Sequence, residues 1–152
     1  MTVQLVSDSF DAWQTLSNYQ NQAQAGKYGA TAVFVGTMRD FNQGDGVIAM
    51  NLEYYPGMTE RQLERIIEQA NQQWALLDTL LIHRVGKVVP DDSLVLVASW
   101  AAHRGDAFDS CRFIMEALKK QAPFWKQETL ASGQVRWVES NSLGYQDSAD
   151  PL

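Results

Sequence analysis

The stretch from residue 106 to residue 130, DAFDSCRFIMEALKKQAPFWKQETL, places an amphipathic helix directly before a β-strand. The apolar positions at helical spacing are Ala107, Phe108, Cys111, Ile114, Met115 and Leu118. The helix is expected over residues 106–121, because Pro123 cannot continue it. Alternation then predicts a strand over residues 124–130, with Lys126 and Glu128 on one face. This order indicates a chain of mixed helices and strands.

Two lysines end this helix in different settings. Lys119 lies at the edge of the apolar stripe, one turn after Met115, whereas Lys120 points away from it. Partial desolvation of a lysine disfavours its ammonium form and suits it to act as a base or nucleophile. Lysines in the last turn of a helix are also commonly solvated charges that favour the helix dipole. We interpret Lys120 in the second way, and both interpretations stay open for Lys119 at this point.

The remaining segments alternate between strand and helix patterns without linkers or repeats. The nearly continuous apolar run at residues 30–38 predicts a strand buried on both faces, and the turn-forming residues 40–46 predict a mobile loop. Thr59 and Gln62 fit a capping box at the start of a second long helix. Further strands are expected at residues 3–6, 47–55, 77–87, 93–101 and 134–138, with a short helix at 10–19. We therefore predict an α+β fold, with one mixed or antiparallel sheet flanked by two longer helices.

Composition limits the possible functions. The chain has 152 residues and 45% hydrophobic content, which suits one domain over residues 1–140, followed by a flexible acidic tail over 141–152. The net charge of −6 argues against general binding to nucleic acid or to anionic membranes. The N-terminus lacks a basic, apolar leader, and no apolar run approaches the roughly 20 residues of a membrane span. These features predict a cytoplasmic protein.

Cysteine and histidine are scarce. The one cysteine, Cys111, lies on an apolar helix face and is expected to be a buried structural thiol rather than a nucleophile. The two histidines, His83 and His103, are distant in sequence and form no zinc-ligand cluster. We therefore expect no metal site.

Other basic residues follow the ends of predicted strands. Arg39 comes after the first buried strand, and His103 and Arg104 lie between a strand and the helix that carries Lys119. The first turn of a helix is a natural site for phosphate, and arginine can bind phosphate or carboxylate in a bidentate manner. Taken singly, each arginine also fits a surface salt bridge, and His103 fits a hydrogen-bonded structural histidine.

Five ordered segments between residues 29 and 140 form a specific set, although each by itself is a weak motif. They are Val35-Gly36-Thr37-Met38-Arg39-Asp40, Leu52-Glu53-Tyr54-Tyr55-Pro56-Gly57-Met58-Thr59, Ile82-His83-Arg84-Val85-Gly86, Ala102-His103-Arg104, and Phe113-Ile114-Met115 continued by Ala122-Pro123-Phe124-Trp125-Lys126. The set resembles the large, catalytic subunit of molybdopterin synthase. This resemblance implies an α/β hammerhead fold and a homodimer within a heterotetramer.

The resemblance also implies a reaction and a partner. Two sulfurs are inserted into cyclic pyranopterin monophosphate, which yields the dithiolene of molybdopterin. The sulfur arrives as a thiocarboxylate on the C-terminal Gly-Gly tail of a small ubiquitin-like subunit, so no resident cofactor is expected. A phosphorylated substrate would explain a local basic site in an acidic protein.

Residue by residue, the family's catalytic lysines fall on Lys119 and Lys126. We expect Lys119 to shuttle protons or engage the intermediate, and Lys126 to hold the substrate and stabilise negative charge. Arg136 resembles a further basic position that reaches a pocket across the dimer, and Phe41 stands where members often have histidine. The implied substrate-binding residues are Thr37, Met38, Arg39, His103, Arg104, Lys119, Lys126, Gln127 and Glu128.

Two other classes of function are considered. A non-catalytic oligomeric regulator could bind a phosphorylated metabolite with the arginines alone, without a desolvated Lys119. A phosphotransfer enzyme that uses His103 would need a nucleotide or magnesium site, and the sequence has neither a GxxxxGK[ST] loop nor a suitable carboxylate cluster. The regulator is therefore the main alternative.

Overall fold

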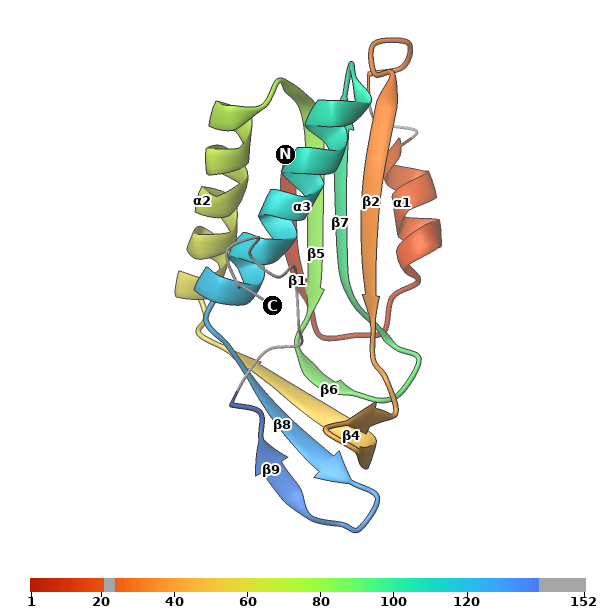
Figure 1. Cartoon of the computed structure of the whole chain (residues 1–152), viewed down its shortest axis with the longest axis vertical. Coiled ribbons are helices and arrows are strands. Elements are labelled where there is room, and N and C mark those ends of the chain that lie inside the picture. The colour runs from red at the N-terminus through yellow and green to blue at the C-terminus, as the bar shows by residue number, and fades with distance from the viewer. Residues whose placement is uncertain (21–23, 140–152) are drawn as a thin grey trace, which may run out of the picture.

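Two β-sheets lie one beyond the other along the long axis of the computed structural model, which describes residues 1–20 and 24–139 (Figure 1). The first sheet has the order β1 (Thr2–Val6), β5 (Leu76–Arg84), β7 (Ser93–Ala101) and β2 (Ala30–Thr37). The second has the order β3 (Phe41–Asn42), β4 (Asp45–Tyr54), β8 (Phe124–Leu130) and β9 (Val135–Trp137), and β6 (Gly86–Val88) also pairs with β4. The α+β class is confirmed. The prediction of one sheet was wrong, because β4 and β8 pair with each other rather than with the strands of the first sheet.

Helices cover both faces of the first sheet. The two expected longer helices, α2 (Met58–Gln73) and α3 (Arg104–Gln121), both lie on one face, and the short α1 (Ala12–Gln20) lies on the other (Figure 1). The pleat of β5 alternates its side chains between these layers, so Leu81 packs in the α2 and α3 core while Leu80 and Ile82 pack in the α1 core. None of the helices in the described part of the chain is long and apolar enough to cross a membrane.

The apolar strand β2 is an edge strand, which corrects the prediction that it is buried on both faces. Within the described residues it pairs only with β7. Ala32 is buried, but Phe34 is 41% exposed. An apolar run indicates burial somewhere along a strand, but it does not distinguish a central strand from an edge strand that borders a pocket.

Residues 40–46 form a β-hairpin instead of the predicted mobile loop. Phe41 pairs with Gly46 and Asn42 pairs with Asp45. The two residues between them, Gln43 and Gly44, have φ angles of 52° and 82°. Positive φ at both central residues is what a tight two-residue hairpin turn requires, and glycine adopts it without steric cost.

The start of α2 also differs from the prediction of a capping box at Thr59 and Gln62. The N-cap is Gly57, whose N–H donates to the Glu60 carboxylate at 2.6 Å. Thr59 is fully buried in the first turn, where its hydroxyl accepts from the Tyr55 N–H and donates to the Pro123 carbonyl at 3.1 Å. This contact fixes the start of α2 against the junction between α3 and β8.

The predicted strand at residues 77–87 is divided in two. The chain bends at Gly86, which has a φ of 79°, so β5 ends at Arg84 in the first sheet and β6 begins in the second. The strand predicted at residues 93–101 is confirmed as β7, and it pairs antiparallel with β5. The expected tail over residues 141–152 lies outside the described residues.

Candidate active site

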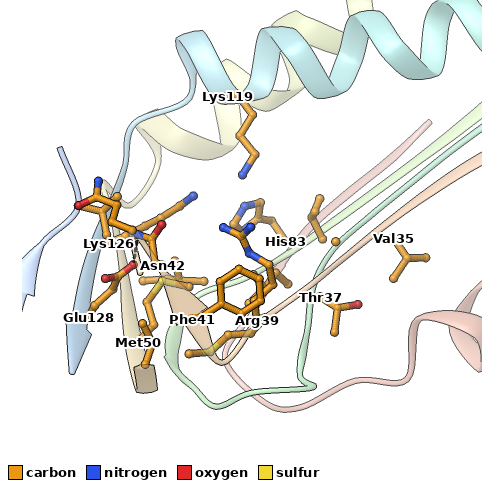
Figure 2. A pocket seen from close by; sticks show the side chains of 18 of the residues that line it. Val35, Thr37, Arg39, Phe41, Asn42, Met50, His83, Lys119, Lys126 and Glu128 are labelled. Atoms are coloured by element: carbon orange, nitrogen blue, oxygen red, sulfur yellow. Dashed lines mark hydrogen bonds between the residues drawn. The ribbon is translucent and has the colours of Figure 1, made fainter. Parts of the chain in front are cut away.

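An open pocket of about 760 Å³ lies where the end of α3, the exit of β2 and the inner face of the second sheet meet (Figure 2). The structure brings to its walls six residues that the sequence analysis singled out. They are Thr37, Met38, Arg39, Lys119, Lys126 and Glu128. Apolar side chains from β2, β4 and β7 form much of the remaining wall.

Lys119 and Lys126 meet in this pocket from different elements. Lys119 occupies the last turn of α3 directly after the buried Leu118, and the turn at Pro123 leads β8 back so that Lys126 faces the same cavity. The two side chains are close enough for Lys119 to act on the ionisation of Lys126. Burial and the nearby Lys119 lower the pKa of Lys126 to about 7, although Glu128 acts in the opposite direction. Near neutral pH Lys126 can therefore be present as a neutral amine.

Glu128 is a buried carboxylate with its own partners. Its two oxygens accept from Asn42 Nδ2 at 2.6 Å and from Arg136 Nε at 3.1 Å. Arg136 also donates to Asp45 at 2.8 Å and to the Asn42 carbonyl at 3.0 Å. In this protomer Arg136 therefore anchors the hairpin and Glu128 behind the pocket wall, and its expected role across a dimer stays a prediction.

Arg39 lies at the pocket opening with its guanidinium 4.9 Å from the centre of the Phe41 ring. This cation–π contact holds the cation where an entering anion would meet it. Met38 precedes it and is buried, with its N–H bonded to the Asp92 carbonyl and its carbonyl bonded to the Asp91 N–H. The backbone of Met38 is thus occupied, and its side chain is the part that lines the pocket.

His83 is a site residue that was not predicted from the sequence. It lies on β5, is 4% exposed, and lines the pocket between the lysines and the first sheet (Figure 2). Burial, reinforced by the charges of Lys119 and Lys126, lowers its pKa to about 4, while its hydrogen bond to the Arg84 carbonyl acts in the opposite direction. Two signals in the sequence could have found it: His83 lies within the ordered segment at residues 82–86, and it follows Leu81 by two residues in an apolar strand, which places both on the same face.

Three predicted binding residues lie outside the pocket of a single protomer. His103 occupies the N-cap position of α3 without a capping hydrogen bond from its side chain, Arg104 is the first residue of the helix, and both are exposed. The 15-residue separation of Arg104 from Lys119 corresponds to about 22 Å along a helix. Gln127 pairs with Asn51 and does not line the pocket, because alternation turns it to the outer face of the second sheet. Their binding roles stay predictions.

Cys111 is buried, as expected. Its thiol lies 3.9 Å from the Val97 carbonyl, and burial raises its pKa to about 11, which leaves little thiolate for nucleophilic chemistry. Across residues 1–20 and 24–139, no three side chains of the types that bind metals come together.

Fold and site together define an α+β protein in which a lysine pair and an arginine line one open pocket. The chain belongs to the MoaE protein family, whose model matches residues 7–121. The molybdopterin synthase catalytic subunit of Vibrio cholerae is 42% identical over 141 residues, which are 93% of each chain. The corresponding subunit of Ralstonia nicotianae is 56% identical over 112 residues, which are 74% of this chain and 63% of that protein.

The solved structures agree with this assignment. The molybdopterin biosynthesis MoaE protein of Burkholderia ambifaria superposes with a TM-score of 0.75 at 44% identity, and the match covers 95% of this chain and 93% of that one. The family predicted from the five ordered segments is therefore confirmed.

Proposed function

We propose that this chain is the catalytic subunit of a molybdopterin synthase. Its reaction is the insertion of two sulfurs into cyclic pyranopterin monophosphate, which makes it a sulfurtransferase. The observation that carries the proposal is the convergence of Lys119 and Lys126 beside Arg39 in a single pocket. Membership of the MoaE family and relatives named as catalytic subunits of this enzyme support it.

The charge of the pocket suits a phosphorylated substrate. The protein carries a net charge of −6, so a general attraction for anions is absent and the cations of the pocket must supply it locally. Arg39 at the opening can bind phosphate in a bidentate manner, and the lysines lie deeper. Glu128, the carboxylate in the pocket wall, is already bound by Arg136 and Asn42, which limits its repulsion of an anion.

The sulfur is proposed to come from a second protein. Cys111 is buried and its pKa is raised to about 11, so it is unsuited to carry sulfur. A small ubiquitin-like subunit with a thiocarboxylate on its C-terminal Gly-Gly tail fits instead, because an extended glycine tail is thin enough to enter an open pocket. The wall along β2 ends in a strand edge that no other described strand pairs with. On this proposal the enzyme needs no resident cofactor or metal.

We also propose how the subunits assemble and where in the cell the enzyme acts. A homodimer within a heterotetramer would let His103 and Arg104 of one copy serve the pocket of the other, since about 22 Å of helix separates Arg104 from Lys119 within one protomer. The enzyme is proposed to act in the cytoplasm.

The lysines divide the chemistry between them. For transfer, the thiocarboxylate sulfur bonds to a carbon of the substrate, which joins partner and substrate through a thioester. A nucleophile must then attack the acyl carbon of this thioester, so that its C–S bond breaks and the sulfur stays on the substrate. Lys126, with a pKa of about 7, can supply the neutral amine that activates water or attacks directly. The ammonium of Lys119 then stabilises the developing negative charge. These roles reverse those expected from the position of Lys119 on its helix, because Lys126 is the lysine whose pKa burial lowers.

The test is an assay of the purified chain with cyclic pyranopterin monophosphate and the thiocarboxylated partner, each omitted in turn. We expect dithiolene product only when both are present. Lys119→Ala and Lys126→Ala should each abolish it, whereas Lys120→Ala, at the exposed neighbouring lysine, should retain it. A folded protein that binds the phosphate compound but forms no product would instead support the regulatory alternative.

A further inference from the structure

His83 is held in one orientation by two contacts on β5 and β8. Its ring stacks on Phe124, with centroids 4.0 Å apart and planes 13° apart. Its Nδ1 lies 2.7 Å from the carbonyl oxygen of Arg84. Since a carbonyl oxygen only accepts hydrogen bonds, Nδ1 carries the hydrogen, and a neutral imidazole then has its lone pair on Nε2. His83 is therefore a fixed acceptor in the pocket wall.

Cations face this acceptor. Figure 2 shows Lys119 reaching from α3 toward the His83 ring, with Lys126 entering from β8. The charged groups that line the pocket with His83 are Arg39 after β2, Lys119 on α3, and Lys126 and Glu128 on β8. Glu128 is bound to Arg136. The pKa of His83 is lowered to about 4, so the ring is neutral where the enzyme works.

We propose that His83 is a positioning residue, whose neutral ring accepts a hydrogen bond at Nε2 from the ammonium of Lys119 and so keeps the proton of the lysine pair on Lys119. This inference rests on the proposed function and deepens it. With the proton held on Lys119, Lys126 remains the neutral amine that faces the reacting carbon. Without this acceptor, the ammonium of Lys119 loses a contact that stabilises it, and the productive arrangement is populated for less of the time.

The proposal has a pH signature. The active pair carries one proton, so activity falls in acid when the pair gains a second proton and in alkali when it loses its last one. A neutral acceptor beside Lys119 stabilises the Lys119 ammonium whether the pair carries one proton or two. It therefore has little effect on gain of the second proton, which sets the acid limb. It opposes loss of the last proton, which sets the alkaline limb. Loss of the acceptor should therefore move the alkaline limb of the pH–rate profile to lower pH and leave the acid limb in place. For one hydrogen bond from a charged donor, the expected displacement is about one pH unit.

Two variants separate the two ring nitrogens. His83→Asn keeps an N–H near the position of Nδ1 and loses the acceptor, so its alkaline limb should move. His83→Gln places an amide oxygen near the position of Nε2, so its alkaline limb should stay near that of the wild type. A purely structural role predicts an even loss of activity at every pH in both variants, and that result would overturn the proposal, as would an unmoved alkaline limb in His83→Asn.

A second measurement needs no turnover. Nitrogen chemical shifts of the two histidines in the unliganded full chain report which ring nitrogen is protonated, and the exposed His103 serves as the internal comparison. We expect His83 to be neutral at about pH 6 with hydrogen on Nδ1, unlike an ordinary exposed histidine. A protonated His83 at that pH, or hydrogen on Nε2, would overturn the proposal even if the synthase assay succeeds. The expected shifts together with no product would refute the synthase activity alone.

Discussion

Arg136 donates from Nε to the buried carboxylate of Glu128 at 3.1 Å, and this bond joins β9 to β8 directly behind the pocket. Glu128 in turn raises the pKa of Lys126 against the larger effects of burial and Lys119. Arg136→Met should leave that carboxylate less compensated, so the pKa of Lys126 should rise above about 7. We expect the acid limb of the pH–rate profile to move to higher pH and the melting temperature to fall.

The control for this change is Asp45→Asn. Asp45 accepts from the same guanidinium at 2.8 Å, but its side chain is 54% exposed, so the loss of this ion pair should have little effect on stability. An equal displacement of the acid limb in both variants would contradict the role assigned to Glu128.

The lowered pKa of Lys126 predicts how stability depends on pH. In the unfolded chain Lys126 has the ordinary lysine pKa of 10.5, whereas in the folded protein its pKa is about 7. Between these two pH values the unfolded state therefore binds more protons than the folded state. The free energy of unfolding consequently rises with pH across this range. Below about pH 7 both states are protonated, and the full cost of burying the ammonium is present. Lys126→Met should therefore stabilise the protein most below about pH 7, and its advantage should shrink toward about pH 10.5.

Thermal unfolding of the wild type and Lys126→Met across this pH range measures the difference. Lys120→Met is the matched control, because Lys120 is exposed at the end of α3. If Lys126→Met raised the stability by the same amount at every pH, the prediction would be contradicted.

The parts of the fold that the sequence predicted well are those whose periodicity reflects burial. The helical stripe that ends at Leu118 and the alternation of Lys126 and Glu128 in β8 arise from neighbours in the sequence, and both elements form as expected. The hairpin at Gln43 and Gly44 was less predictable, because turn-forming residues suit a loop and a tight turn equally. One contact that orders the hairpin is the hydrogen bond from Asn42 to Glu128, which lies 86 residues further along the chain.

The site residues that could be predicted are those marked by a local pattern or by the family resemblance. Arg39 and Lys119 were singled out by their positions at element ends, Lys126 by the alternation of its strand, and all three by the family resemblance. The fold brings them together. His83 was not, because its orientation depends on stacking against Phe124, a contact between β5 and β8 that no local pattern encodes. Arg104 shares a helix with Lys119, yet the length of that helix keeps them apart in one protomer.

Phe41 should affect the binding of the substrate more than the chemical step. Its ring lies 4.9 Å from the guanidinium carbon of Arg39, and an exposed cation–π contact contributes roughly 0.5–1 kcal/mol. Phe41→Leu should therefore weaken binding of the phosphorylated substrate by about 2- to 5-fold, seen as a higher KM with kcat nearly unchanged. Phe41→Tyr, which keeps a ring under the guanidinium, should bind as the wild type does. A fall in kcat without a change in KM would show that Phe41 acts on the lysines instead.

Cys111 provides the sharpest test of where the sulfur comes from. The thiol is buried against Val97, and its pKa is raised to about 11, so it is a poor nucleophile and a poor carrier of persulfide. Cys111→Ala should keep full transfer of sulfur from the thiocarboxylated partner, with a slightly lower melting temperature because a small cavity opens under α3. Product measured per thiocarboxylate consumed should match the wild type. Loss of transfer in a variant that is folded and still binds the partner would place the cysteine, rather than the partner alone, on the path of the sulfur.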